Sequence, residues 1–214
     1  LMHNVKPIFG LQFHPEVNDT LCGRQILKNF AEICRADQNW NTQTVFKQIT
    51  DGVRGKIGDK HVFAFISTGN DSSVLAKFLQ TIVPPERLHF FYMLGLGPEE
   101  DLQKINLVGG SFAVVDARRK LYKALRGVTD PELKREKIAN IFSDDVFAAE
   151  ILKHAREIGL KTDELVIAQG TIYPDVIESG PRGAAKIKSH HNSRLRELLK
   201  EYGIDILEPF FYLF

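Results

Sequence analysis

Four short, continuous apolar runs, separated by segments with helical spacing, constrain the fold of this chain more than any other feature. They occupy residues 62–66, 88–94, 112–115 and 165–168. Runs that do not alternate with polar residues are typical of parallel strands that are covered on both faces. Strands that alternate with helices imply an open parallel sheet with helices on both faces. We therefore expect an α/β fold.

Apolar residues recur at helical spacing in the segments between these runs, and turn residues mark several ends. The spacing predicts helices over residues 22–36, 45–57, 74–82 and 131–159. Pro84 and Pro85 stop the third of these helices, because proline cannot continue the backbone ladder. Asp130 supplies an N-cap and Pro131 a preset first turn for the fourth, and Gly159 ends it.

The first forty residues contain too little pattern for a complete domain. We expect one strand at residues 7–13 and the helix at 22–36, which together form a remnant over residues 1–36. Residues 37–41 are polar, lack a period and are expected to be a linker. The main domain is then expected at residues 42–214.

Charge and cysteine content exclude several classes of function. The formal net charge of +1 gives no global basic field for nucleic acid. No apolar run reaches the roughly 18 residues of a membrane span, and no secretory signal is visible. The two cysteines, Cys22 and Cys34, form no CxxC pair. We expect a cytoplasmic protein without a cysteine metal cluster, a membrane partner or a nucleic-acid partner.

The loop at residues 67–73 follows the first buried strand directly and reads STGNDSS. In open parallel sheets, ligands collect outside the carboxyl ends of the strands, where this loop is expected. Its small residues allow close approach of a ligand, and the following helix start favours an anion. Hydroxyl groups of Ser67, Ser72 and Ser73 add donors, and Asp71 can hold Mg²⁺ between two phosphates.

The alternative for this loop is an ordinary N-cap of Ser, Asn and Asp, which many strand-to-helix turns contain. The loop is not a Walker A motif, because it has no Gly-Lys-Ser/Thr ending. A phosphate loop without that lysine suggests cleavage between the α and β phosphates of a nucleotide.

The loop resembles the S-G-G-x-D-S-S signature of the N-type ATP pyrophosphatases, which have the adenine nucleotide alpha hydrolase-like fold. It matches at Ser67, Gly69, Asp71, Ser72 and Ser73. The resemblance implies that ATP pyrophosphate is bound by Ser67, Thr68, Gly69, Asn70, Asp71, Ser72 and Ser73, with Mg²⁺ on Asp71. Thr68 replaces the first glycine of the signature, and it crowds the phosphates if that position needs a positive φ.

Two further segments, AQGTIYPDVIES at residues 168–179 and KIKSHHN at 186–192, follow the last predicted strand. Taken alone, Asp175 and Glu178 are candidate Mg²⁺ ligands beside cations for phosphates. His190 and His191 are adjacent and not at i and i+4, so solvated loop residues are favoured over a metal pair. The neighbouring lysines and arginine are equally typical of a solvated run.

Both segments resemble motifs of the glutamine-hydrolysing GMP synthetases, as does GVTDPE at residues 127–132. The resemblance implies a ligase that uses ATP and Mg²⁺ to adenylate XMP and lets glutamine-derived ammonia displace AMP, giving GMP. It assigns substrate binding to Asp175, Glu178 and Lys188, and a second Mg²⁺ contact to Asp175. The family is homodimeric through a domain expected beyond Phe214, and its adenosine-contacting Asp and Asn are replaced by Met93 and Leu94.

The segment GLQFHPEV places His14 two residues before Glu16, directly after the first predicted strand. A histidine oriented by a carboxylate can activate a cysteine nucleophile and protonate a leaving amine. A solvent-exposed turn is the alternative for such a short motif. The flanking residues resemble the end of class I glutamine amidotransferase domains, in which this pair is catalytic. Neither Cys22 nor Cys34 precedes the pair, so we expect no glutamine hydrolysis by this chain alone.

Two other functions stay open at this point. One is a degenerate or truncated homologue that binds a nucleotide without turnover, which Thr68, Met93 and Leu94 favour. The other is an ATP pyrophosphatase that aminates a different carbonyl.

Overall fold

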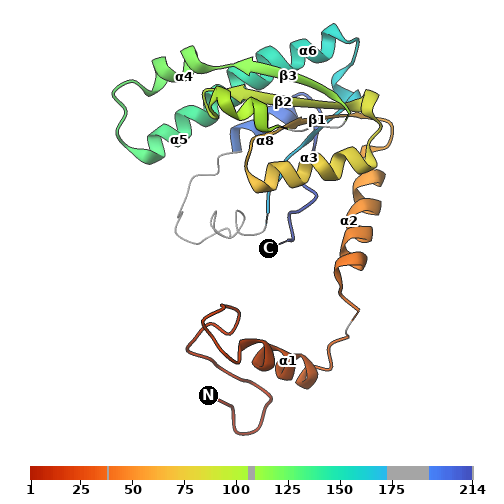
Figure 1. Cartoon of the computed structure of the whole chain (residues 1–214), viewed down its shortest axis with the longest axis vertical. Helices are drawn as coiled ribbons and strands as arrows, with labels where there is room; N and C mark the ends of the chain where they lie inside the picture. The colour runs from red at the N-terminus through yellow and green to blue at the C-terminus, as the bar shows by residue number, and fades with distance from the viewer. Residues whose placement is uncertain (38, 106–108, 173–192, 214) are drawn as a thin grey trace. The chain divides into compact units, whose positions relative to one another are not determined.

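The computed structural model describes residues 1–37, 39–105, 109–172 and 193–213 (Figure 1). The chain divides into two compact units, Leu1–Gln48 and Ile49–Phe214. The division falls inside one helix, α2 (Thr42–Ile57). None of the helices in the described part is long and apolar enough to cross a membrane.

The first unit contains α1 (Gly23–Ile33) and the beginning of α2. The helix predicted at residues 22–36 is therefore confirmed. The strand predicted at residues 7–13 is wrong, because only an isolated antiparallel bridge between Met2 and Phe9 forms there. A strand needs a neighbouring strand that bonds to its backbone N–H and C=O groups. Among the described residues, residues 7–13 pair with no strand and form only the bridge from Phe9 to Met2.

The second unit is built on a five-stranded sheet. Its strands are β1 (His61–Phe65), β2 (Leu88–Leu94), β3 (Ser111–Asp116), β4 (Leu165–Ala168) and β5 (Asp205–Leu207). Their order is β3-β2-β1-β4-β5, and every neighbouring pair is parallel. The chain adds β2 and β3 on one side of β1 and then β4 and β5 on the other. The strand order therefore reverses between β1 and β4.

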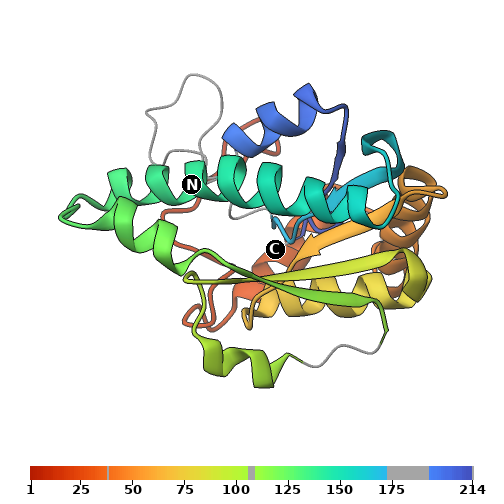
Figure 2. The same cartoon turned by 90° about the horizontal axis from the view of Figure 1, so that it is seen from above.

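Helices cover both faces of this sheet, which confirms the predicted fold class. Val62 and Ala64 pack with α3 (Asn70–Ile82) and the second half of α2. Phe63 points to the opposite face, where it packs with η3 (Ile141–Ile151), α6 (Leu152–Glu157) and α8 (Ser193–Glu201). Figure 2 shows α3 on one side of the sheet, and on the other side α8 and the long helical segment that η3 and α6 belong to. Strands β1, β2 and β4 are continuously apolar because both of their faces are buried. For the run at residues 112–115 that expectation is wrong, because β3 is an edge strand on which Phe112 and Val114 are exposed.

The connection from β3 to β4 is helical almost throughout. It contains α4 (Arg118–Leu125), α5 (Pro131–Asn140), the π-helix η3 and α6. Asp130 accepts a 2.7 Å hydrogen bond from the Leu133 amide, so the predicted N-cap is confirmed. The helix ends at Glu157, and Gly159 follows with φ +82°, as the glycine stop predicts. The π-helical middle and α4 were not expected.

Three short 3-10 helices complete the described part. They are η1 (Pro85–Arg87), η2 (Glu99–Lys104) and η4 (Thr162–Glu164). Of these, η2 lies in the connection between β2 and β3 and bears on the candidate site below.

Candidate functional site

A hollow of about 340 Å³ lies at the carboxyl ends of β1 and β4, where the strand order reverses. One wall comes from the loop after β1 and includes Ser67, Gly69 and Asp71. The other wall comes from the end of β4 and includes Gln169 and Gly170. Such a switch point is where open parallel sheets bind ligands, because the two adjacent loops leave in opposite directions. The structure thus brings the predicted loop to the expected place.

The start of α3 has no side-chain cap. Gly69 is the N-cap residue, with φ −68° and ψ 154°, and it has no side chain to offer. Within the described residues, the backbone amides of Asn70, Asp71 and Ser72 find no acceptor. The N-cap alternative for this loop is therefore wrong, since Asn70 and Asp71 lie inside the helix. Uncapped amides at a helix start attract an anion.

The serines of the loop hold its shape by bonding to one another. The hydroxyl oxygens of Ser67 and Ser72 lie 2.8 Å apart. The Ser67 amide donates to Ser72 Oγ at 3.1 Å, and the Gly69 amide donates to Ser67 Oγ at 3.2 Å. These bonds fix the turn before the helix begins. The amides of Asn70, Asp71 and Ser72 take no part in these bonds.

Thr68 is accommodated without the strain that its β-branched side chain suggests. Among the described residues, Arg35 is the one non-glycine residue with positive φ, so Thr68 does not occupy the left-handed region. Its hydroxyl donates to Asp101 Oδ2 at 2.8 Å. Asp101 in turn accepts from Lys104 Nζ at 2.5 Å, and these two bonds, with Lys104 first, lower the pKa of the Asp101 carboxyl. The bond to Asp101 likewise raises the pKa of Lys104.

A second hollow, of about 300 Å³, includes the same loop in its lining. Ser67, Thr68 and Ser73 contribute to it together with two lysines, Lys77 and Lys104. Positive charge therefore stands next to the loop, although the loop itself contains no lysine.

The wall from β4 is tied to the C-terminal segment. Thr171 Oγ1 donates to Glu208 Oε1 at 2.7 Å. Arg196 Nη2 donates to both oxygens of the same carboxylate, at 2.6 and 2.7 Å. The Glu208 side chain is only 11% exposed, so the bonds from Thr171 and Arg196 are needed to stabilise its negative charge.

The carboxyl end of β2 carries apolar side chains at the two positions where the GMP synthetase resemblance expects an adenosine-contacting Asp and Asn. Met93 and Leu94 are buried, with exposed fractions of 5% and 6%. A surface hollow of about 1080 Å³ is lined by Leu94 and the residues after it and reaches α4. There Arg118 pairs with Asp116 at 2.6 Å and with Glu99 at 2.9 Å.

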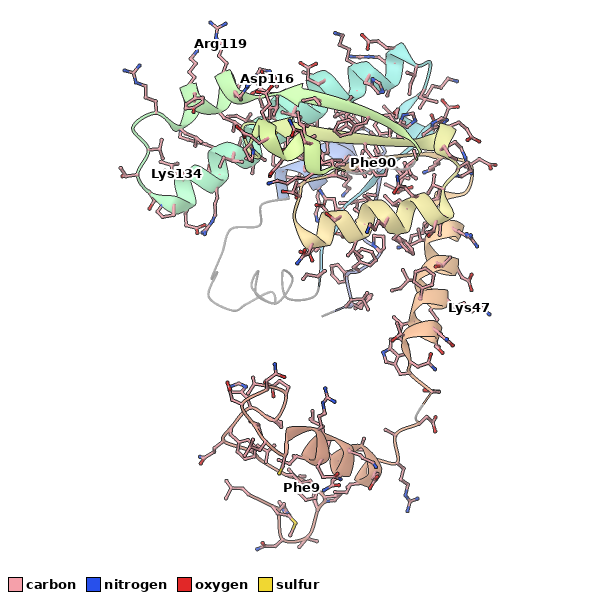
Figure 3. The ribbon with its side chains drawn as sticks, in the orientation of Figure 1. Phe9, Lys47, Phe90, Asp116, Arg119 and Lys134 are labelled. Carbon is pink, nitrogen blue, oxygen red and sulfur yellow. The ribbon has the colours of Figure 1, made fainter. Side chains whose placement is uncertain are left out.

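No sequence motif indicated Arg118, because it lies on α4 and its partner Glu99 lies in η2, 19 positions earlier. Its bonds lower the pKa of Asp116, and the bond to Asp116 raises the pKa of Arg118. Figure 3 labels Asp116 at the end of β3 and Arg119 on α4. An Arg at the start of a helix directly after a strand is the only local signal that this position carried.

Three predicted site residues, Asp175, Glu178 and Lys188, lie outside the described residues. Across residues 1–37, 39–105, 109–172 and 193–213, no three His, Cys, Asp or Glu side chains gather as a metal site. Asp71 is exposed in the first turn of α3, where its carboxylate offers oxygen atoms of the kind that Mg²⁺ prefers.

In the first unit, His14 and Glu16 are brought together. His14 Nδ1 and Glu16 Oε1 lie 2.7 Å apart, and both side chains are exposed. A backbone hydrogen bond and then the bond to His14 lower the pKa of Glu16. Among the described residues the His14 ring bonds to no thiol, and Cys22 and Cys34 are free and exposed.

A family model and curated relatives match this chain in sequence. The family model for class I glutamine amidotransferases matches residues 1–34. The GMP synthase [glutamine-hydrolyzing] of Thermus thermophilus is 41% identical over 96% of this chain and 40% of its own length. The enzyme of the same name from Schizosaccharomyces pombe is 39% identical over 100% of this chain and 40% of its own length.

Among solved structures, the NH3-dependent NAD synthetase from Campylobacter jejuni is similar at 12% identity, with a TM-score of 0.46. That match covers 76% of this chain and 73% of the other. The chain spans about two fifths of the length of the curated relatives that it matches.

Proposed function

This chain is a homologue of a portion of the glutamine-hydrolysing GMP synthases, and on that premise we propose that it carries the ATP pyrophosphatase chemistry of XMP amination. The oxygen at C2 of XMP attacks the α-phosphorus of ATP, and the bond from that phosphorus to the leaving pyrophosphate breaks. Ammonia then adds to C2 of the adenylated purine, AMP leaves with the bonding electron pair, and GMP results after loss of a proton.

One observation supports this proposal more than any other. The amides of Asn70, Asp71 and Ser72 are uncapped at the start of α3, and Asp71 and Ser72 line the hollow at the switch point of the sheet. A helix start at such a point stabilises the charge that collects on the outer phosphates as pyrophosphate leaves. The whole loop, Ser67, Thr68, Gly69, Asn70, Asp71, Ser72 and Ser73, is proposed as the pyrophosphate site.

Mg²⁺, when bound, neutralises phosphate charge and orients the leaving group. Asp71 is proposed as its protein ligand, with Asp175 as a second contact. Glu178 and Lys188 are proposed to contact the purine nucleotide. These three assignments beyond Asp71 rest on the motifs at residues 168–179 and 186–192.

We propose His14 and Glu16 as part of the machinery that releases ammonia from glutamine. The 2.7 Å contact supports this role, because a carboxylate that orients an imidazole prepares it for proton transfer. We therefore propose that residues 1–36 are the remnant of an amidotransferase domain, residues 37–41 a linker and residues 42–214 the ATP pyrophosphatase domain. The free, exposed thiols Cys22 and Cys34 are compatible with a reducing, cytoplasmic location.

The full chain is tested by pyrophosphate release with ATP, Mg²⁺, XMP and ammonia. We expect release that requires XMP and is lost in Asp71→Ala. Pyrophosphate release by the original chain that is no higher than that of Asp71→Ala would contradict the proposed enzymatic activity. Release without XMP, in the presence of another acceptor, identifies a different amination.

Nucleotide binding without turnover is the second candidate function. It is favoured by Met93 and Leu94, which are apolar and buried at the two positions where the resemblance expects Asp and Asn to contact adenosine. Saturable Mg-ATP binding without pyrophosphate release would establish it.

A further inference from the structure

We propose that Asp101 is a positioning residue that fixes the loop before α3 and supplies it with Lys104 as a phosphate-binding cation. The inference rests on the proposed pyrophosphate site and deepens it. It concerns a residue of η2 that no sequence motif indicates.

The Asp101 carboxylate joins two segments that are distant in the sequence. Its Oδ2 accepts from Thr68 across a separation of 33 residues, and its Oδ1 accepts from Lys104. The side chain of Asp101 is 13% exposed, so little of it is left for solvent or for another ligand. Both oxygens are therefore committed to holding these two side chains.

The segment that carries Asp101 is itself fixed to the sheet. Tyr92 in β2 is buried, and its hydroxyl donates to the carbonyl of Pro98 at 2.9 Å. Pro98 is the N-cap residue of η2. A β-carbon on Gly97 would lie 2.1 Å from the Tyr92 hydroxyl oxygen, so only glycine allows this approach. Asp101 is thus placed one 3-10 turn after a point anchored in β2.

Lys104 presents the free end of this arrangement. Its side chain is 67% exposed, in contrast to that of Asp101. It lines the 300 Å³ hollow together with Ser67 and Ser73. An ammonium group has three donors, and Asp101 uses one, so two remain for an anion.

Stability alone does not account for such a pair. The Lys104 side chain is 67% exposed, so its ammonium group is already solvated, and holding it in one position costs side-chain freedom. A lysine beside a phosphate loop, by contrast, acts as a point charge on a ligand anion. The loop at residues 67–73 contains no lysine, and Lys104 supplies that charge from a neighbouring segment.

Binding of inorganic pyrophosphate with Mg²⁺ to the full chain, measured by calorimetry, tests the inference. We expect Lys104→Met to weaken binding by about tenfold and Lys104→Arg to restore most of it. Thr68→Val is expected to weaken binding by about threefold to tenfold, and Thr68→Ser to restore it, because serine keeps the hydroxyl.

Lys153→Met is the matched control, since Lys153 forms an exposed i,i+4 ion pair with Glu157 on α6. It is expected to bind pyrophosphate like the original chain. Asp101→Ala should weaken binding as Lys104→Met does, while the unfolding midpoint stays close to that of the control. A loss of binding that Thr68→Ser and Lys104→Arg fail to restore indicates a merely structural role.

The outcomes separate this inference from the proposed function. If the original chain binds no pyrophosphate, both are overturned. If it binds and Lys104→Met binds equally well, only the role of Asp101 and Lys104 is overturned. If pyrophosphate binding is weaker in Lys77→Met but not in Lys104→Met, the phosphate-binding cation is Lys77 of α3. That result would also overturn the role of Asp101 and Lys104.

Discussion

Gly170 lies so close to Asp71 that a β-carbon on residue 170 would be 3.3 Å from the Asp71 carbonyl oxygen. Its next nearest neighbours would be the Asp71 carbonyl carbon and the Ser72 amide nitrogen. The segment after β4 therefore contacts the first turn of α3 through backbone atoms. This contact closes one side of the 340 Å³ hollow.

We expect Gly170→Ala to weaken Mg-ATP binding by about fivefold, or ~1 kcal/mol, because backbone must shift at the helix start. Equilibrium binding of Mg-ATP measures this. Gly55→Ala is the matched control, since a β-carbon at that helical glycine meets nothing within 4 Å. Equal affinity of Gly170→Ala and the control would show that this approach does not shape the site.

Glu208 is expected to stabilise the second unit through its two partners. Glu208→Gln removes the charge that Arg196 and Thr171 satisfy, leaving the arginine without its carboxylate. We expect a loss of about 1–3 kcal/mol in the free energy of unfolding, measured with urea. Glu201→Gln on α8 is the control, and a change no larger than that of the control would count against the role.

His89 should make stability depend on pH. The His89 ring is buried. Its Nε2 lies 2.9 Å from His61 Nδ1, and its Nδ1 forms a 2.7 Å hydrogen bond with Ser111 Oγ. Burial, and then the charges of His61 and His154, lower its pKa from 6.5 to about 4. The folded state therefore favours neutral His89. The contribution of His89 to the free energy of unfolding is fully present above pH 6.5 and is lost as the pH falls toward 4.

The loss amounts to roughly 3 kcal/mol at most, and urea unfolding between pH 7.5 and 4.5 measures it. His89→Asn should flatten this part of the profile. An unchanged slope in His89→Asn would assign the pH dependence to other groups, of which His61 is the first to examine.

Asp130 is expected to stabilise α5 as its N-cap. Asp130→Ala leaves the Leu133 amide without its acceptor and should cost about 1 kcal/mol of unfolding free energy. Asp130→Asn is the control, because asparagine caps almost as well. Equal stability of the alanine and asparagine variants would contradict the capping role.

The sequence predicted those parts of the fold that depend on neighbours along the chain. Apolar runs located β1, β2 and β4 because both faces of these inner strands are buried, and a run also located the edge strand β3, although Phe112 and Val114 are exposed there. Asp130 and Gly159 located the ends of the long helical segment, because caps are local. The run at residues 7–13 failed for the opposite reason, as a strand forms only where a partner strand is present.

The candidate site divides in the same way. Small residues after a buried strand located the loop at 67–73. The contacts that support it, from Asp101 to Thr68 and from Glu208 to Thr171, join residues 33 and 37 positions apart. No periodicity or motif connects such pairs, so only the folded chain brings them together.

The central claim is that the turn opening α3 holds the outer phosphates of ATP, and amide chemical shifts test it most directly. A ¹⁵N-labelled full chain is titrated with Mg-ATP and then with magnesium pyrophosphate. We expect both ligands to shift the amides of Asn70, Asp71 and Ser72 most, with smaller changes at Gly170. Saturation by Mg-ATP with these amides unmoved would contradict it.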